Sequence, residues 1–334
     1  MSNIQSASQR YLKEWKISAD KLDYWGEHFL PFYEPFFIQN EEIVHQLLNQ
    51  GFVIFTQAEF YDTYPSFYID YGFIYNLWEI PYKTYVWMCS SDQRAQVSAD
   101  LLQAIFQEQY ILQRGQVYQE NELKYYDKQA IEYISTIESM SNRFPYGEHS
   151  YLLLTSDLWQ TYPMEMKNNW IQQWMLEQMK DHPRGIKEIG SIDVHPFVKN
   201  RVEQYNGSFA DQCGANCFAA TLALASSPDH TDSIIQLWLH QAPFLRSLDA
   251  LNYDQVFAIT DTTQLGMIEP LDVLIWNNAE EQAIHASFCI APDYIFTKMG
   301  QSWIQPWLAT TMVSIFDYAD VIQNGGQIKV YRKR

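Results

Sequence analysis

The spacing of apolar residues changes along the chain and predicts several helices. From Asp92 to Arg114 apolar side chains recur every three or four positions among Gln, Asp and Glu, which predicts an amphipathic helix. A helix is also predicted from Asn40, a residue suited to an N-cap, to Gly51, which suits the left-handed position after a helix. Residues 121–140 and 163–179 carry further helical patterns.

Short runs of β-branched and aromatic residues, broken by Gly and Pro, predict strands elsewhere. Such runs occupy 52–55 and recur between 66 and 88. Three more follow one another late in the chain, at Pro270–Trp276, Ala283–Ile290 and Tyr294–Lys298. Mixed helical and strand patterns without an internal repeat predict the α+β class.

Turn-forming residues gather between 181 and 202, which contains Pro183, Gly185, Gly190 and Pro196. A chain of 334 residues is long enough for two domains. We therefore expect an accessory α+β domain of unassigned role over 1–190 and a second domain over 191–334.

Composition and charge narrow the classes of function. Hydrophobic residues make up 47% of the chain and charged residues 19%, so a packed core is expected rather than disorder. The formal net charge of −18 argues against nucleic acid or an anionic membrane as partner, because both require clustered Lys and Arg.

Targeting signals and a disulfide framework are not evident in the sequence. The first twenty residues are polar, and no run of 18 apolar residues occurs. The chain has only four cysteines, at 89, 213, 217 and 289. These features predict a cytoplasmic protein.

The clearest chemical pattern surrounds Cys217. A Gly-containing turn at 211–216 leads into an Ala- and Leu-rich segment, with Asn216 at the N-cap position and Cys217 in the first helical turn. The helix dipole and free backbone N–H groups there favour a thiolate and can hold an oxyanion. His285 opens one of the late strands, where its ring can serve as the base that a nucleophilic cysteine needs.

These residues together resemble the papain-like cysteine hydrolases, specifically the NlpC-type cell-wall peptidase family. That family has a Tyr before the nucleophile, a Cys that starts a helix, a strand of the form Pro-Gly-Asp-Leu-Val-Phe, and a strand that begins with the catalytic His. The chain offers Tyr205, Cys217, Pro270–Trp276 and His285 in the same order. The resemblance covers about residues 200–333 and implies a papain-like domain, with a helix carrying Cys217 packed on an antiparallel sheet carrying His285.

The resemblance also implies a third polar residue twelve positions after the catalytic His. Thr297 occupies that position, where the family usually has His, and Asp293 and Gln301 are alternatives. The Thr297 hydroxyl can accept the imidazole N–H. Gln212 resembles the oxyanion-hole glutamine of papain, although it lies only five residues before Cys217.

Two local departures separate the chain from the family pattern. Leu271 replaces the Gly of the strand motif. Around the nucleophile, Asn216-Cys217-Phe218-Ala219 replaces the family's Asp-Cys-Ser-Gly and is closer to the Cys-Gly-Ser-Cys-Trp of papain.

The implied activity is hydrolysis of an amide or isopeptide bond through a thioester on Cys217. His285 would move the proton, Thr297 would orient its ring, and the Cys217 N–H with Gln212 or Tyr205 would hold the oxyanion. The expected substrate is a small peptide or amide, by resemblance a bacterial cell-wall peptide with γ-linked or D-amino acids. No cofactor or metal is expected.

Alternatives remain open at this point. A catalytically silent papain-like domain would act as a binding module, with the accessory domain contacting a protein partner. An acyltransferase would use the same residues, and Cys217 alone is also typical of a buried core residue. A redox or metal pair of Cys213 with Cys217 is disfavoured, because no second pair accompanies it. Asp272 is expected to cap a turn.

Overall fold

The computed structural model describes residues 15–126, 142–179, 185, 189–319, 321–322 and 324–334. The chain divides into two compact units, of which unit 1 comprises residues 1–17 and 176–334, and unit 2 comprises residues 18–175. Both units combine helices with antiparallel sheets, which confirms the α+β class. The division falls at 175/176, whereas the turn-rich segment of the sequence favoured 190/191. In the part of the chain that the structure describes, no helix is both long and apolar enough to cross a membrane.

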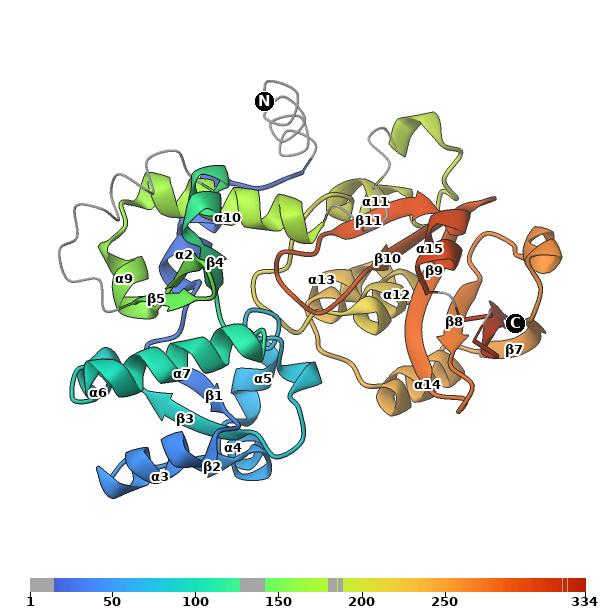
Figure 1. Ribbon diagram of the computed structural model, residues 1–334. Coiled ribbons are helices and arrows are strands. Elements are labelled where there is room, and N and C mark those ends of the chain that lie inside the picture. Colours follow the sequence, from blue (N-terminus) through green and yellow to red (C-terminus); the bar gives the residue numbers. More distant parts are fainter. Residues whose placement is uncertain (1–14, 127–141, 180–184, 186–188, 320, 323) are drawn as a thin grey trace. The chain divides into compact units, whose positions relative to one another are not determined.

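Unit 2 contains two three-stranded sheets, with strand orders β1-β3-β2 and β4-β6-β5, in which all pairs are antiparallel (Figure 1). One apolar core joins side chains of β1 and β3 with those of α3, α7, β5 and β6. The elements of this unit are α2 (Ala19–His28), β1 (Glu34–Ile38), α3 (Glu41–Asn49), β2 (Phe55–Thr56), α4 (Gln57–Thr63), α5 (Pro65–Tyr71), η1 (Leu77–Glu79), β3 (Tyr85–Cys89), α6 (Ser91–Arg94), α7 (Ala99–Ile111), β4 (Val117–Gln119), η2 (Glu120–Tyr125), β5 (Arg143–Tyr146), β6 (His149–Leu153), α9 (Ser156–Thr161) and α10 (Met164–Gln178), which continues into unit 1.

Local caps explain where several helices of unit 2 begin. The Asn40 side chain accepts the Glu42 N–H at 2.9 Å, which confirms the helix predicted after it. The predicted strand at 52–55 is confined to Phe55–Thr56, because Thr56 and Glu59 form a capping box that starts α4.

Other elements of unit 2 differ from the sequence prediction. The start of the predicted strand region at 66–88 is wrong, because Pro65 begins the helix α5, a position in which its missing N–H costs nothing. The helix predicted over 92–114 is divided into α6 and α7, and Ser98 caps the second. The helix predicted over 121–140 begins as the short η2, and residues 127–141 lie outside the described part.

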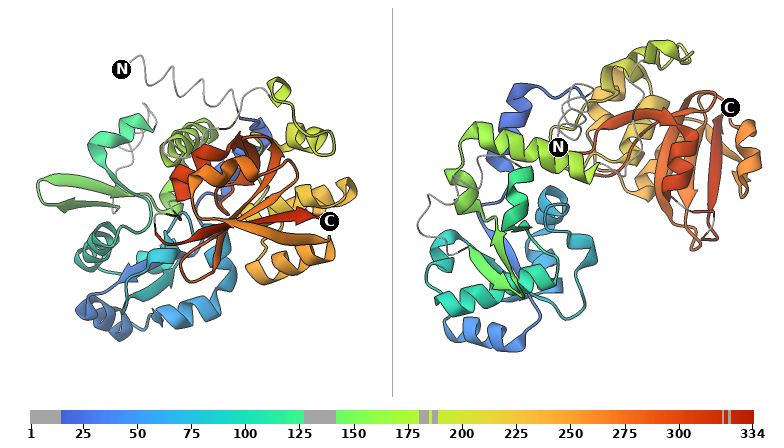
Figure 2. Two further views of the ribbon diagram at one scale, coloured as in Figure 1. Left: turned by 90° about the vertical axis from the view of Figure 1, so that its right-hand side faces the viewer. Right: turned by 45° about the horizontal axis from the view of Figure 1, so that its top comes forward.

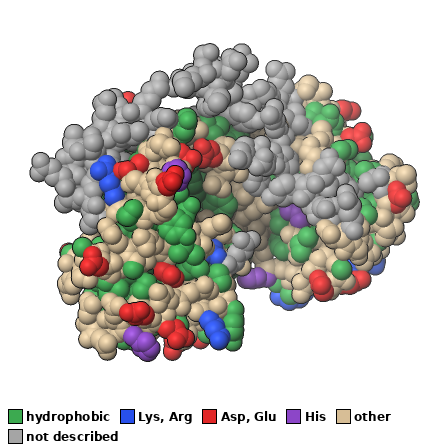
Figure 3. Space-filling view, in the orientation of Figure 1, with side chains coloured by type: hydrophobic (Ala, Val, Ile, Leu, Met, Phe, Trp, Pro, Cys, Tyr) green, Lys and Arg blue, Asp and Glu red, His purple; other side chains and the backbone are tan. Residues whose placement is uncertain are grey.

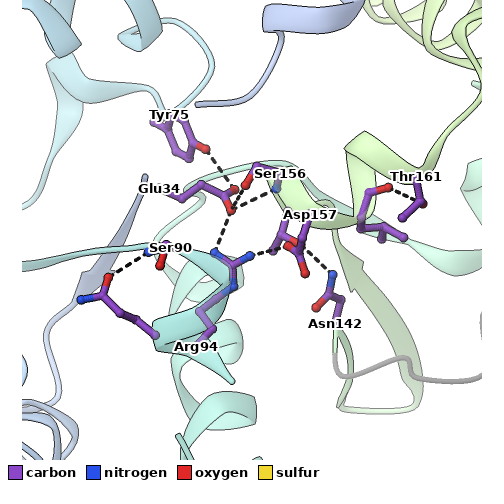
Figure 4. A network of polar contacts seen from close by, with 11 residues as sticks. Glu34, Tyr75, Ser90, Arg94, Asn142, Ser156, Asp157 and Thr161 are labelled. Carbon is purple, nitrogen blue, oxygen red and sulfur yellow. Dashed lines mark hydrogen bonds and ion pairs between the residues drawn. The ribbon is translucent and has the colours of Figure 1, made fainter. Parts of the chain in front are cut away.

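A buried ion pair ties three elements of unit 2 together (Figure 4). Arg94 of α6 donates to Glu34 of β1 at 2.9 Å, and both side chains are 4% exposed. The same carboxylate accepts the N–H and the hydroxyl of Ser156 in α9, each at 3.0 Å, and the Tyr75 hydroxyl at 3.3 Å. Arg94 also donates to Asp157. The hydrogen bonds compensate for the burial of two charges, which is otherwise expensive.

Unit 1 is built on a six-stranded antiparallel sheet with the order β11-β10-β9-β8-β12-β7. Figure 2 shows this sheet from two further sides, with the yellow and orange helices beside it. The described elements of unit 1 after α10 are η3 (Ile189–Ser191), α11 (Lys199–Tyr205), α12 (Cys217–Ala225), η4 (Pro228–His230), α13 (Thr231–Ile235), α14 (Gln241–Ala250), β7 (Tyr253–Ile259), η5 (Thr262–Met267), β8 (Val273–Asn277), β9 (Ala283–Ala291), β10 (Tyr294–Lys298), β11 (Trp307–Thr311), α15 (Met312–Ala319) and β12 (Gln327–Lys333).

Alternating side chains divide the core of unit 1 between the two faces of the sheet. On one face Ala286, Phe288 and Phe296 belong to a cluster with the residues of α12 and α14. On the other face Leu274 and Trp276 belong to a cluster that includes the start of α15. The helix α12 is therefore covered on its sheet side by β9 and β10, and all nine of its residues are buried.

Charged side chains on the surface do not form a basic patch on the face shown in Figure 3. There the Lys and Arg side chains stand apart from one another, and acidic side chains are scattered over both units. This distribution accompanies the formal net charge of −18.

Candidate active site

Asn216 holds the N-terminus of α12 in two ways. Its side-chain oxygen accepts the Ala219 N–H at 3.1 Å, which caps the helix, and its side-chain nitrogen donates to the Leu239 carbonyl at 2.7 Å. The helix begins at Cys217, as the sequence predicted. The cap therefore fixes both the start of the helix and the loop that leads into it.

Arg201 of α11 holds the opposite end of α12. Its guanidinium is buried and donates to the carbonyls of Ala223 and Ser226 at 2.9 and 3.0 Å. A cation at this end satisfies carbonyls that the helix leaves free and interacts favourably with the helix dipole. Both ends of the helix that carries Cys217 are thus fixed by side chains.

The strands β9 and β10 separate at the end that lies near Cys217. Their ladder pairs residues only up to Phe288 with Phe296, in this fully described part of the sheet. Beyond that pair the start of β9 continues against β8, and the end of β10 continues against β11. Thr297 spans the opening by donating its hydroxyl to the Ala286 carbonyl at 2.9 Å.

His285 and Thr297 come together in this opening. The Thr297 Oγ1 lies 3.0 Å from Nε2 of His285, and the Ser287 hydroxyl lies 3.4 Å from the same nitrogen. Thr297 has one hydroxyl hydrogen, and the Ala286 carbonyl can only accept it. Nε2 is therefore the protonated nitrogen that donates to Thr297, and Nδ1 keeps its lone pair. This tautomer is the one that a general base requires.

The surroundings of the imidazole keep it neutral. Its ring packs edge to face on Trp276, with centroids 5.3 Å apart, and 9% of the residue is exposed. Burial lowers the pKa of His285 to about 4, because the charged form loses its hydration. At neutral pH the ring is thus an uncharged acceptor rather than an imidazolium.

The sulfur of Cys217 lies against the backbone of β9 at Ala286, on the face of the sheet that α12 covers. His285 and Thr297 alternate toward the opposite face, where His285 packs on Trp276. The backbone N–H groups of Ala286, Phe218 and Cys217 itself hydrogen-bond the sulfur and favour its anion, as does the positive charge of Lys298. Burial outweighs them and raises the pKa of Cys217 to about 11. The sequence predicted a lowered pKa from the helix N-terminus alone, and the structure differs because the thiol is enclosed by the sheet.

Lys298 is a neighbour of Cys217 that the sequence analysis did not single out. It ends β10 and is fully buried, and its amine donates to the carbonyls of Gly300 and Ser302 at 2.7 and 2.6 Å. Burial lowers the pKa of Lys298 to about 7, and the sulfurs of Cys213 and Cys217 act in the opposite direction. The only sequence signal for Lys298 is its position directly after Thr297 in a strand. Because side chains alternate between the two faces of a sheet, Lys298 points to the face that α12 covers.

The structure places the two residues predicted to hold the oxyanion in different environments, Tyr205 in a tertiary contact and Gln212 at the surface. The Tyr205 hydroxyl donates to Asp232, and the Tyr205 ring packs on Trp307. Gln212 is exposed in the loop before α12. That loop is fixed to the segment after β10 by the Gly214 N–H, which donates to the Gln301 carbonyl at 2.8 Å.

The structure also shows the positions of Asp293, an alternative to Thr297, and of Asp272, which was predicted to cap a turn. Asp293 is exposed in the turn between β9 and β10, at the other end of β10 from Thr297. Asp272 accepts the Glu269 N–H at 2.8 Å, which confirms that it caps a turn, and it receives two hydrogen bonds of 2.8 Å from Arg332.

Leu271 adopts a backbone conformation that favours glycine. Its φ of 78° lies in the left-handed region, which a side chain with a Cβ enters at a cost of about 1–2 kcal/mol. The NlpC-type strand motif has Gly at this position. The local conformation thus gives a physical reason for the glycine, although the residue here is Leu.

Comparison of the chain with protein-family models, with curated proteins and with solved structures gives no match in any of the three. Among the described residues, no group of three or more His, Cys, Asp and Glu side chains is arranged to hold a metal ion.

Proposed function

We propose that unit 1 is a papain-like cysteine hydrolase that cleaves an amide or isopeptide bond through a thioester on Cys217. The observation that carries the proposal is the placement of Cys217 at the capped start of α12, where its sulfur meets the N–H of Ala286, the residue after His285. Thr297 holds Nε2–H of His285 on the opposite face of the sheet, so the imidazole has to turn at the open end of β9 for Nδ1 to reach the thiol.

Two further observations support the papain-like assignment. A capped helix that begins at the cysteine packs against an antiparallel sheet that carries the histidine and its partner. The left-handed backbone at Leu271 occurs where the family motif has Gly. Neither depends on the overall length or composition of the chain.

The proposed reaction starts from the neutral thiol and imidazole. Nδ1 of His285 takes the thiol proton as the sulfur attacks the carbonyl carbon, and the N–H of Cys217 stabilises the oxyanion. The imidazolium then gives the proton to the leaving amine, and a thioester remains. Water then attacks the thioester carbonyl while His285 takes one of its protons. The C–S bond breaks to release the acid, and the imidazolium returns the proton to the sulfur, which restores the thiol. Starting from the neutral pair fits the raised pKa of Cys217 and the lowered pKa of His285.

The substrate class follows only from the resemblance. We propose a small peptide that contains a γ-linked or D-amino acid, and a cytoplasmic protein would meet such peptides as free fragments rather than as intact wall. The same thioester could also transfer its acyl group to an amine. With an amine nucleophile added, acyl transfer would form a new amide, whereas hydrolysis would form the acid.

The test combines alkylation with hydrolysis. Iodoacetamide at neutral pH should label Cys217 faster than Cys213 in the folded protein, although Cys213 is more exposed, and His285→Ala should remove this preference. A γ-linked peptide amide should be cleaved by the wild type and by Cys213→Ser, and Cys217→Ser should abolish cleavage.

If Cys217 reacts no faster than Cys213 and no peptide is cleaved, unit 1 is a silent papain-like domain. The binding-module alternative would then replace the hydrolase, and unit 2 would become the first place to look for a protein partner.

A further inference from the structure

Lys298 is a buried amine, and in the part of the chain that the structure describes no carboxylate neutralises it. Its side chain is fully buried, and among the described residues no ion pair joins it to Asp or Glu. Two hydrogens of the ammonium go to the carbonyls of Gly300 and Ser302. Burying a cation without a counter-ion costs free energy, so a role for Lys298 beyond stability is expected.

The groups near Lys298 that can become anions are two cysteines. Electrostatic interaction joins its amine to the sulfurs of Cys213 and Cys217, and in return its charge acts on the Cys217 sulfur. The titratable side chain that acts on that sulfur is Lys298, which ends β10 on the face of the sheet where α12 packs. His285 is neutral at pH 7, which leaves Lys298 as the side chain able to supply positive charge.

We propose that Lys298 is a positioning residue that supplies the counter-charge for the Cys217 thiolate during the reaction. This inference rests on the proposed function, because it assumes that Cys217 reacts as an anion. His285 exchanges protons with the substrate, whereas Lys298 stays in place and stabilises the negative sulfur from the side of β10. Its two carbonyl partners hold the amine in position without neutralising its charge.

A purely structural role makes a different prediction. Lys298 also ties the end of β10 to the segment that follows it, so its removal will lower the stability of unit 1 in either case. Only the counter-charge role changes the pH at which Cys217 becomes reactive.

The experiment measures the rate of Cys217 alkylation by iodoacetamide against pH in the wild type and in Lys298→Met. The variant should move the midpoint for Cys217 upward by at least about one pH unit and lower its rate at pH 7 at least about tenfold. Lys167→Met is the matched control, because Lys167 is also a buried lysine but lies in unit 2. The control should leave the profile of Cys217 unchanged. An unchanged midpoint in folded Lys298→Met overturns the proposal.

A second measurement keeps the proposal testable if Lys298→Met does not fold. The ¹³Cε resonance of Lys298 is titrated in the wild type and in Cys217→Ser. Coupling is reciprocal, so loss of the sulfur anion should let Lys298 lose its proton at lower pH. Equal midpoints in the two proteins overturn the proposal.

The two hypotheses fail in different ways. A shifted alkylation profile without cleavage of any peptide supports the Lys298–Cys217 pair and contradicts hydrolysis. Peptide cleavage with an unshifted profile supports hydrolysis and contradicts the role of Lys298.

Discussion

A single hydroxyl determines which nitrogen of His285 is free. Thr297 gives its hydrogen to the Ala286 carbonyl and can only accept from the imidazole, so it selects the tautomer with the lone pair on Nδ1. Under the proposed function, this one acceptor oxygen would orient the imidazole.

Replacing Thr297 by Val should therefore reduce reactivity while keeping the shape of the side chain. Nε2 would lose its closest partner, the other tautomer would become populated, and Cys217 alkylation at pH 7 should fall about tenfold. Thr297→Ser keeps the hydroxyl and should stay within about threefold of the wild type. Equal rates for Val and Ser would contradict the orienting role.

Burial of His285 should make unfolding depend on pH. The folded pKa of about 4 lies below the unfolded value of about 6.5, so the unfolded state binds more protons between these values. The contribution of neutral His285 to stability is complete above about pH 6.5 and decreases as the pH falls toward 4.

The free energy of unfolding, measured in urea at pH 7.5 and 5.0, should show this loss. Between pH 7.5 and 5.0 the free energy of unfolding should fall by about 2 kcal/mol less in His285→Gln than in the wild type, because Gln does not titrate. Parallel losses in the two proteins would show that His285 is charged in the folded state.

At the scale of elements, the turn before β8 contains backbone strain at Leu271. Leu271→Gly should keep the stability of unit 1 within about 1 kcal/mol of the wild type, because relief of the φ of 78° offsets lost packing. Leu271→Val should be less stable than Leu271→Gly by about 1–2 kcal/mol, since a branched Cβ suits this region worst. Urea unfolding of both variants measures the difference. If the Val variant is as stable as the Gly variant, the backbone at residue 271 is not strained.

The elements of the site were predictable because their signals are local. The N-cap Asn216 and the Ala-rich run define α12, and β-branched residues between turns define β10 with the bounds Tyr294–Lys298. Ser66–Tyr71 has a strand-like composition but forms part of α5, because Pro65 starts a helix and tertiary packing decides the rest.

The electrostatics of the site were not predictable from the sequence. The pKa of Cys217 depends on enclosure by β9 and β10, which no local pattern reveals. Lys298 looked like an ordinary strand end, and the packing of α12 on β10 makes it a neighbour of the sulfur. The partner of Tyr205, Asp232, is also a tertiary contact.

At the scale of the whole molecule, each unit has its own core. The cluster around β1, β3 and α7 lies within unit 2, and the clusters on the two faces of the six-stranded sheet lie within unit 1. We therefore expect a substitution in the core of unit 2 to leave the Cys217 site intact, and the Glu34–Arg94 pair offers a sensitive place to test this.

Glu34→Gln leaves the buried Arg94 without its buried carboxylate partner, since Asp157 is half exposed, and should destabilise unit 2 by about 3 kcal/mol. Hydrogen exchange read by mass spectrometry should show faster exchange in peptides from 18–175, with peptides from 189–319 and the alkylation of Cys217 unchanged. The double variant Glu34→Leu with Arg94→Met removes both charges and should recover part of the lost stability, because no unpaired charge remains buried. Faster exchange throughout both units after Glu34→Gln would mean that they unfold together, and unit 2 would then be a structural support of the site.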